Sequence, residues 1–123
     1  GTVYNLTLLD KLTDSEGNTI EDYPSSVYNK MEIADVDWNT IQEGLHQVAL
    51  NTKAFDGLDL TIAGKTGTAQ QSKSHPNHAL FMGYAPYENP QISFCVILEG
   101  GYTGVPGAQQ VTKALLDAFF DEY

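Results

Sequence analysis

Three strand-like segments follow one another closely in the second half of the chain. They span residues 58–70, 78–86 and 91–99, and only a polar loop and the turn Tyr87-Glu88-Asn89-Pro90 separate them. Links this short suit antiparallel pairing, because a parallel pair needs a crossover of about a dozen residues or more. We therefore predict an antiparallel sheet, in a fold of the α+β class.

Two helices are predicted to flank these strands and to pack on the sheet. Residues 37–51 carry apolar side chains at helical spacing, and Pro106 can open a last helix. The predicted inner stripes are Trp38, Ile41, Leu45, Val48 and Ala49 in the first helix, and Val111, Ala114, Leu115, Ala118 and Phe119 in the last.

The first thirty residues have weaker signals. Val3 to Leu12 is rich in Leu and Thr and is predicted as a strand, and residues 14–18 form a cluster of turn-forming residues. Thr19-Ile20 would then return as the second arm of a hairpin, and residues 27–33 are a further short strand.

The amino-acid composition excludes several classes of function. The 123 residues include six Lys, no Arg and sixteen acidic residues, for a net charge of −10. Nucleic acids and anionic membrane surfaces both need clustered cations, so neither is an expected partner. No apolar run reaches the length of about 20 residues that a membrane span requires. A hydrophobic content of 41% indicates a globular chain.

Cysteine and histidine give little support for redox or metal chemistry. Cys95 is the single cysteine, so no intrachain disulfide can form. It could be a nucleophile, but its apolar neighbours favour a small buried hydrophobe in a strand. His75 and His78 lie three positions apart without a Cys pair or carboxylate at ligand spacing, so we expect no metal and no cofactor.

The segment Ala63-Gly64-Lys65-Thr66-Gly67-Thr68-Ala69 is the most informative. Gly64-Lys65-Thr66 could end a phosphate-binding loop, but that pattern needs a glycine where Asp59 stands. A second interpretation is the Lys-Thr-Gly strand of penicillin-recognising serine enzymes. A third is a solvated lysine on an edge strand.

The flanking segments favour the second interpretation. With Gln70, the motif segment resembles the motif strand of class B penicillin-binding proteins. Residues 79–86 and 91–98 resemble their next two strands, and residues 38–48 resemble the preceding helix. The resemblance covers residues 36–122. It implies a peptidoglycan D,D-transpeptidase, in which a serine attacks a D-Ala-D-Ala stem peptide and an amine resolves the acyl-enzyme.

Strand geometry fits such a site. Thr66 and Thr68 share one face of an extended strand, and the long stem of Lys65 can reach the same groove. A cation and two hydroxyls suit a carboxylate. Gly67 allows close approach of another element, and the Thr68 N–H is a candidate oxyanion-hole donor. In the family, the equivalents of Lys65, Thr66 and Thr68 hold the carboxylate of the substrate or β-lactam.

Two companion motifs are absent. No serine is followed three residues later by Lys, or two residues later by Asn, so S-x-x-K and S-x-N are both missing. We therefore expect residues 1–123 to form a single partial transpeptidase domain, its C-terminal half, without the helical part that bears the nucleophile. The alternatives are a non-catalytic binding module and a fragment of a β-lactamase or β-lactam sensor.

The resemblance also implies partners and a location. Stem peptides, β-lactams and the missing N-terminal part of the same domain are the expected partners, at the extracytoplasmic face of a bacterial membrane. Without that part, the sheet should expose an apolar face, with Ile62, Phe81 and Phe94 as candidates. Exposed apolar surface and open edges favour a homo-oligomer.

Overall fold

The computed structural model describes residues 1–70, 72–101 and 107–121. The chain divides into two compact units, Gly1–Trp38 and Asn39–Tyr123. Antiparallel strands and flanking helices form the fold, so the predicted α+β class is confirmed.

The first unit consists of two short antiparallel ribbons. Strand β1 (Thr2–Tyr4) pairs with β4 (Val27–Lys30), and β2 (Lys11–Thr13) pairs with β3 (Thr19–Asp22). The returning arm at 19–20 and the strand near 27 are confirmed, but the single strand predicted for residues 3–12 is wrong. Only its two ends find partner strands; of the three leucines between them, Leu6 and Leu8 are fully exposed and Leu9 is 52% exposed.

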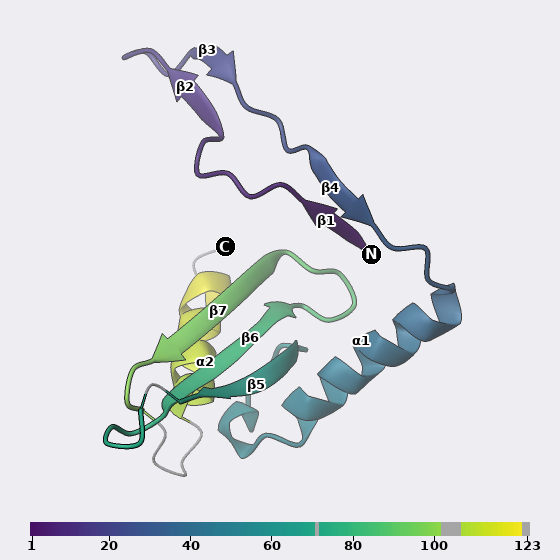
Figure 1. Ribbon diagram of the computed structural model, residues 1–123, viewed down its shortest axis with the longest axis vertical. Coiled ribbons are helices and arrows are strands. Elements are labelled where there is room, and N and C mark those ends of the chain that lie inside the picture. The colour runs from purple at the N-terminus through teal and green to yellow at the C-terminus, as the bar shows by residue number, and fades with distance from the viewer. Residues whose placement is uncertain (71, 102–106, 122–123) are drawn as a thin grey trace. The chain divides into compact units, whose positions relative to one another are not determined.

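The second unit contains a three-stranded sheet (Figure 1). Strands β5 (Ala63–Ala69), β6 (His78–Ala85) and β7 (Ile92–Leu98) lie in sequence order and pair antiparallel, as predicted. Strand β6 is central, so β5 and β7 are the edges among the described residues. The motif strand therefore has one edge without a strand partner.

Strand β5 begins five residues later than predicted. Residues Lys53–Phe55 form the 3₁₀ helix η1, and Gly57 has a φ of 74° in the loop that follows. The partner strand β6 ends at Ala85, near the residue opposite Ala63, so residues before Ala63 have no strand to pair with. Leu58 and Leu60 pack against the core instead.

One face of the sheet carries the core. Phe81 of β6 is fully buried, and its ring centroid lies 5.3 Å from that of Phe55 and 5.8 Å from that of Phe94. Helix α2 (Gly107–Asp121) contacts β6, β7 and η1. The expectation that Ile62 and Phe81 are uncovered is wrong: their exposed fractions are 2% and 0%, because η1 and α2 close this core within the chain.

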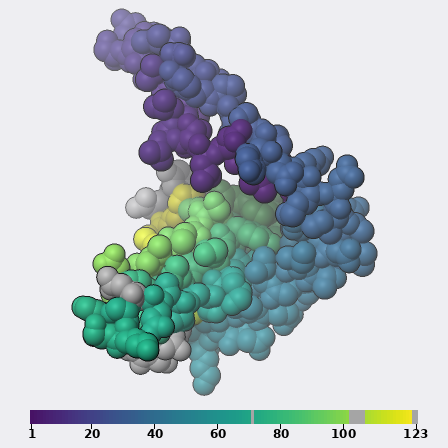
Figure 2. All heavy atoms as spheres, viewed as in Figure 1, coloured from purple at the N-terminus to yellow at the C-terminus, as the bar shows by residue number. Residues whose placement is uncertain are grey.

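The other face of the sheet is the open one. Met82, which pairs with Cys95, is 48% exposed, and Ile97 is 56% exposed. Cys95 is also exposed, so the prediction of a buried cysteine is wrong; strand alternation places it beside Met82 on this face. Figure 2 shows strand residues, in teal and green, at the surface of this unit.

The two predicted helices exist, and four of the five residues of the first predicted stripe are buried or partly buried. In helix α1 (Asp35–Leu50), Ala49 is buried, whereas Ile41 is 47% exposed. In α2, the predicted stripe is wrong: Val111 and Leu115 are exposed, and the buried residues are Ala108, Thr112 and Leu116. Pro106, predicted to open the last helix, lies outside the described residues.

Candidate functional site

The motif residues lie along the edge strand β5. Lys65, Thr66 and Thr68 are exposed, and Gly67 is half-buried. Thr66 lies opposite Phe81 and Thr68 lies opposite Ala79, two positions further along the same strand. Since strand side chains alternate, the two threonines share one face, as predicted.

The ammonium of Lys65 bends toward Thr66. Its Nζ donates to the Thr66 carbonyl oxygen at 2.9 Å and to Thr66 Oγ1 at 3.3 Å. A lysine and a threonine that begin on opposite faces of the strand are thus brought together at its edge. The lysine stem is thus long enough to cross to Thr66, and its reach into a substrate groove stays a prediction.

The close approach of β5 and β6 depends on Gly64 and Gly83 more than on Gly67. A Cβ atom on Gly64 would lie 2.5 Å from Phe81 Cζ and 2.8 Å from the Met82 carbonyl oxygen. A Cβ atom on Gly83 would lie 2.1 Å from the Ala63 carbonyl oxygen. At Gly67 the nearest contact would be 3.2 Å, so this glycine is less constrained within the described residues than Gly64 or Gly83.

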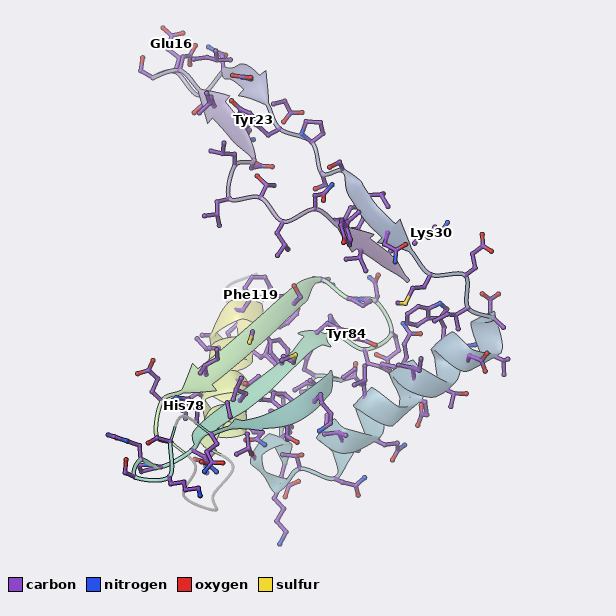
Figure 3. The ribbon with its side chains drawn as sticks, in the orientation of Figure 1. Glu16, Tyr23, Lys30, His78, Tyr84 and Phe119 are labelled. Carbon is purple, nitrogen blue, oxygen red and sulfur yellow. The ribbon has the colours of Figure 1, made fainter. Side chains whose placement is uncertain are left out.

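The two histidines near the end of β5 have separate partners. Nδ1 of His78 accepts the Gly100 N–H at 2.9 Å, and Nδ1 of His75 lies 2.9 Å from Ser72 Oγ. Figure 3 shows His78 at the start of β6. Over residues 1–70, 72–101 and 107–121, no group of three His, Cys, Asp or Glu side chains could hold a metal ion.

A set of contacts that the sequence did not predict holds the segment entering β5. His46 of α1 lies with Nδ1 2.7 Å from the Ile62 carbonyl oxygen, and its ring stacks on Tyr87 with centroids 4.3 Å apart. The Tyr87 N–H donates to the carbonyl oxygen and to Oγ1 of Thr61, each at 3.1 Å. No sequence signal identified His46, because the bond joins residues sixteen positions apart.

Burial and hydrogen bonding shift the pKa values of Tyr87 and Glu88. The Tyr87 hydroxyl donates to Glu43 Oε2 at 3.3 Å, and desolvation followed by the Glu43 charge raises the tyrosine pKa. Glu88 accepts a short hydrogen bond from Thr61 Oγ1, which lowers the pKa of the carboxyl group. These bonds tie the β6–β7 turn to α1 and to the segment that enters β5.

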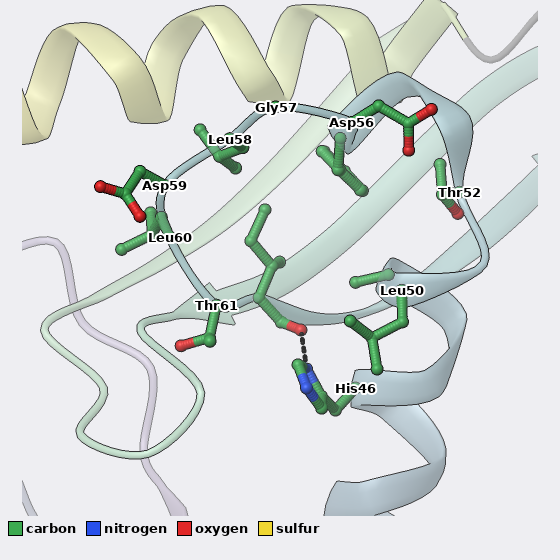
Figure 4. A pocket seen from close by; sticks show the side chains of 12 residues that line it. His46, Leu50, Thr52, Asp56, Gly57, Leu58, Asp59, Leu60 and Thr61 are labelled. Carbon is green, nitrogen blue, oxygen red and sulfur yellow. Dashed lines mark hydrogen bonds between the residues drawn. The ribbon is translucent and has the colours of Figure 1, made fainter.

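A cleft of about 610 Å³ lies beside this segment, at the C-terminal end of α1 (Figure 4). His46, Leu50, Asp56 and Leu58 are among the residues that line it. Lys65, Thr66 and Thr68 do not line it, so the cleft is separate from the motif residues. Among the described helices, none is long and apolar enough to cross a membrane.

Comparisons with known proteins agree with the resemblance in the sequence. The model of the penicillin binding protein transpeptidase domain matches residues 1–117. Peptidoglycan D,D-transpeptidase MrdA of Haemophilus influenzae is 29% identical in an alignment of 104 positions that covers 69% of this chain and 16% of the relative. The chain thus spans about a sixth of that relative's length.

Solved structures share the fold. Pseudomonas aeruginosa PBP2 is 33% identical, with a TM-score of 0.69, over 85% of this chain and 24% of that chain. Penicillin-binding protein A of M. tuberculosis, described as an imipenem acyl-enzyme complex, has a TM-score of 0.68 at 20% identity, over 94% of this chain and 27% of that chain.

Proposed function

Since the chain belongs to the penicillin-binding protein transpeptidase family, we propose that its β5 edge receives the carboxylate of a stem peptide or β-lactam. The observation that carries this proposal is the Lys65 ammonium, held against the carbonyl oxygen and hydroxyl of Thr66 on an exposed strand. The proposed activity of the whole protein is D,D-transpeptidation, and residues 1–123 are its C-terminal, partial transpeptidase domain.

The chemistry of the edge suits a carboxylate. Lys65 supplies a positive charge that has no carboxylate partner in an ion pair among the described residues, and Thr66 and Thr68 add two hydroxyl donors on one face. Charge-assisted hydrogen bonds are roughly twice as strong as neutral ones. Because the whole chain carries a net charge of −10, this local cation is also the feature that would attract an anionic group.

The Thr68 N–H is the proposed oxyanion-hole donor. In an antiparallel strand, the N–H and C=O of one residue point to the same side, and residues two apart share that side. Thr66 and Thr68 are two apart, and the Thr66 carbonyl oxygen is engaged by the Lys65 ammonium. This geometry supports a Thr68 N–H that points to the unpaired edge, where a tetrahedral oxygen could accept it.

The nucleophile is proposed to come from outside these residues. Without S-x-x-K or S-x-N, residues 1–123 taken alone are a carboxylate-binding module that performs no chemistry. The remaining helical part of the domain would supply the serine, on the extracytoplasmic side of a bacterial membrane. Stem peptides and β-lactams are the proposed ligands, and no cofactor is required.

Labelling with a fluorescent penicillin tests this proposal. The full-length protein should acquire a denaturation-resistant label on one serine outside residues 1–123, and an excess of unlabelled β-lactam should prevent labelling. The 123-residue chain, at the same concentration, should remain unlabelled. A labelled serine within residues 1–123, or a full-length protein that no β-lactam labels, would contradict the proposal.

A further inference from the structure

The entry of the motif strand is held from two sides. On one side, His46 of α1 is hydrogen-bonded to the Ile62 carbonyl oxygen at 2.7 Å. On the other, the Tyr87 N–H is bonded to Thr61. The rings of His46 and Tyr87 stack with an interplanar angle of 1°, and this stacking connects the His46–Ile62 bond to the Tyr87–Thr61 bonds. We call these four residues, Thr61, Ile62, His46 and Tyr87, the entry clamp.

From this arrangement, we infer that His46 is a positioning residue for the motif strand. It lies on α1 and does not contact the motif residues; it acts through Ile62, which precedes Lys65 by three residues. This inference rests on the proposed function of β5. Specifically, the His46 N–H sets the position of β5, and the position of β5 in turn places the Lys65 ammonium and the Thr68 N–H.

The hydrogen bond requires a proton on His46 Nδ1. A carbonyl oxygen can only accept, so Nδ1 is the donor. Ile62 is 2% exposed, and a buried carbonyl that loses its donor must either remain unpaired or move to find water. Such a movement would shift the start of β5. Catalytic geometry is sensitive to shifts of this kind, since about 1 Å of misplacement can cost a hundredfold in rate.

Two substitutions test the hydrogen-bond donor and the stacked ring of His46 independently. His46→Phe retains a ring that can stack on Tyr87 but removes the donor. His46→Asn removes the ring but can place an amide N–H close to the former Nδ1 position, because both atoms are attached to Cγ. Gln47→Ala is the matched control, since Gln47 is exposed on the adjacent position of α1 and its side chain bonds only to Glu43 among the contacts described.

The measurement is the second-order rate constant of acylation by a penicillin in the full-length protein, expressed per folded molecule. We expect His46→Phe to lower it about tenfold, the upper range for loss of one net hydrogen bond. His46→Asn should recover it to within about threefold of the unsubstituted protein, and Gln47→Ala should leave it unchanged. A purely structural role would reduce the folded fraction without changing the rate per folded molecule.

Several results would overturn the inference. One is a His46→Phe protein that acylates at the unsubstituted rate, and another is a His46→Asn protein that is slowed as much as His46→Phe. If His46→Phe does not fold, His46→Leu, which also lacks the donor, takes its place, and an unchanged acylation rate there would equally refute the inference. If Lys65→Ala slows acylation while His46→Phe does not, only this inference fails. If the unsubstituted protein is not acylated, the proposed function fails, and this inference with it.

Discussion

Gly64 should be intolerant of a side chain, although it lies outside the Lys-Thr-Gly tripeptide. Its added Cβ would lie 2.5 Å from Phe81 Cζ and 2.8 Å from the Met82 carbonyl oxygen. The Phe81 ring is fully buried between neighbouring aromatic rings, and the second contact is main chain. Neither atom can move aside freely, so the β5–β6 pair would have to separate.

The expected cost follows from overpacking. Extra methyl groups in a packed core typically cost about 1–3 kcal/mol, and we place Gly64→Ala in this range. Gly44→Ala in α1 is the control, for which we expect a change in stability of the opposite sign. A Cβ there meets no atom within 4 Å. An alanine in a helix is more stable than a glycine by about 0.5–1 kcal/mol, so this variant should be stabilised.

Urea denaturation of the 123-residue chain at low micromolar concentration measures both effects. Phe81→Leu removes the ring atoms nearest Gly64, so the cost of Gly64→Ala should fall in that background by at least about 0.5 kcal/mol, as expected for residues in contact. The Met82 carbonyl remains, so part of the cost should persist. A Gly64→Ala chain as stable as the unsubstituted one, or a cost unaffected by Phe81→Leu, would refute the packing argument.

Three further outcomes are expected. The 123-residue chain should self-associate in a dilution series followed by sedimentation, because Met82 and Ile97 are exposed on the open face; a strict monomer at high concentration would contradict this. Thr61→Val should raise the Glu88 pKa toward the ordinary glutamate value, as followed by NMR titration, because its hydrogen bond lowers that pKa. The native Thr61–Glu88 bond should therefore favour folding at neutral pH and be lost as pH falls through the Glu88 pKa, whereas a pKa unchanged by Thr61→Val would exclude this bond as the cause.

The sequence predicted those features that depend on neighbours along the chain. The β6–β7 pair, joined by a short turn, and the alternation that places Thr66 and Thr68 together both follow from local pattern. The start of β5 did not follow, because it depends on where β6 ends. Residues 58–62 alternate like a strand but have no partner strand, since β6 stops at Ala85.

Two other differences come from side-chain hydrogen bonds that a hydrophobic pattern does not reveal. In α2, Thr112 is buried, although Val111 and Leu115 offered a more apolar stripe, because its hydroxyl donates to the Ala108 carbonyl oxygen at 2.8 Å. A satisfied hydroxyl can be buried at little cost, and a hydrophobic pattern cannot register this. The bond between His46 and Ile62 joins residues sixteen positions apart, so no helical periodicity could reveal it.

The carboxylate role of Lys65 is tested most directly by comparing lysines in the full-length protein. Lys65→Ala and Lys73→Ala each remove one exposed positive charge, but Lys73 lies in the loop after β5. If Lys65 binds the ligand carboxylate, Lys65→Ala should lower the second-order rate constant of acylation by a penicillin about ten- to a hundredfold, as expected for a lost charge-assisted contact of roughly 1.5–3 kcal/mol. Lys73→Ala should retain the unsubstituted rate. Equal rate constants for the two variants would contradict the assignment of the β5 edge as the carboxylate site.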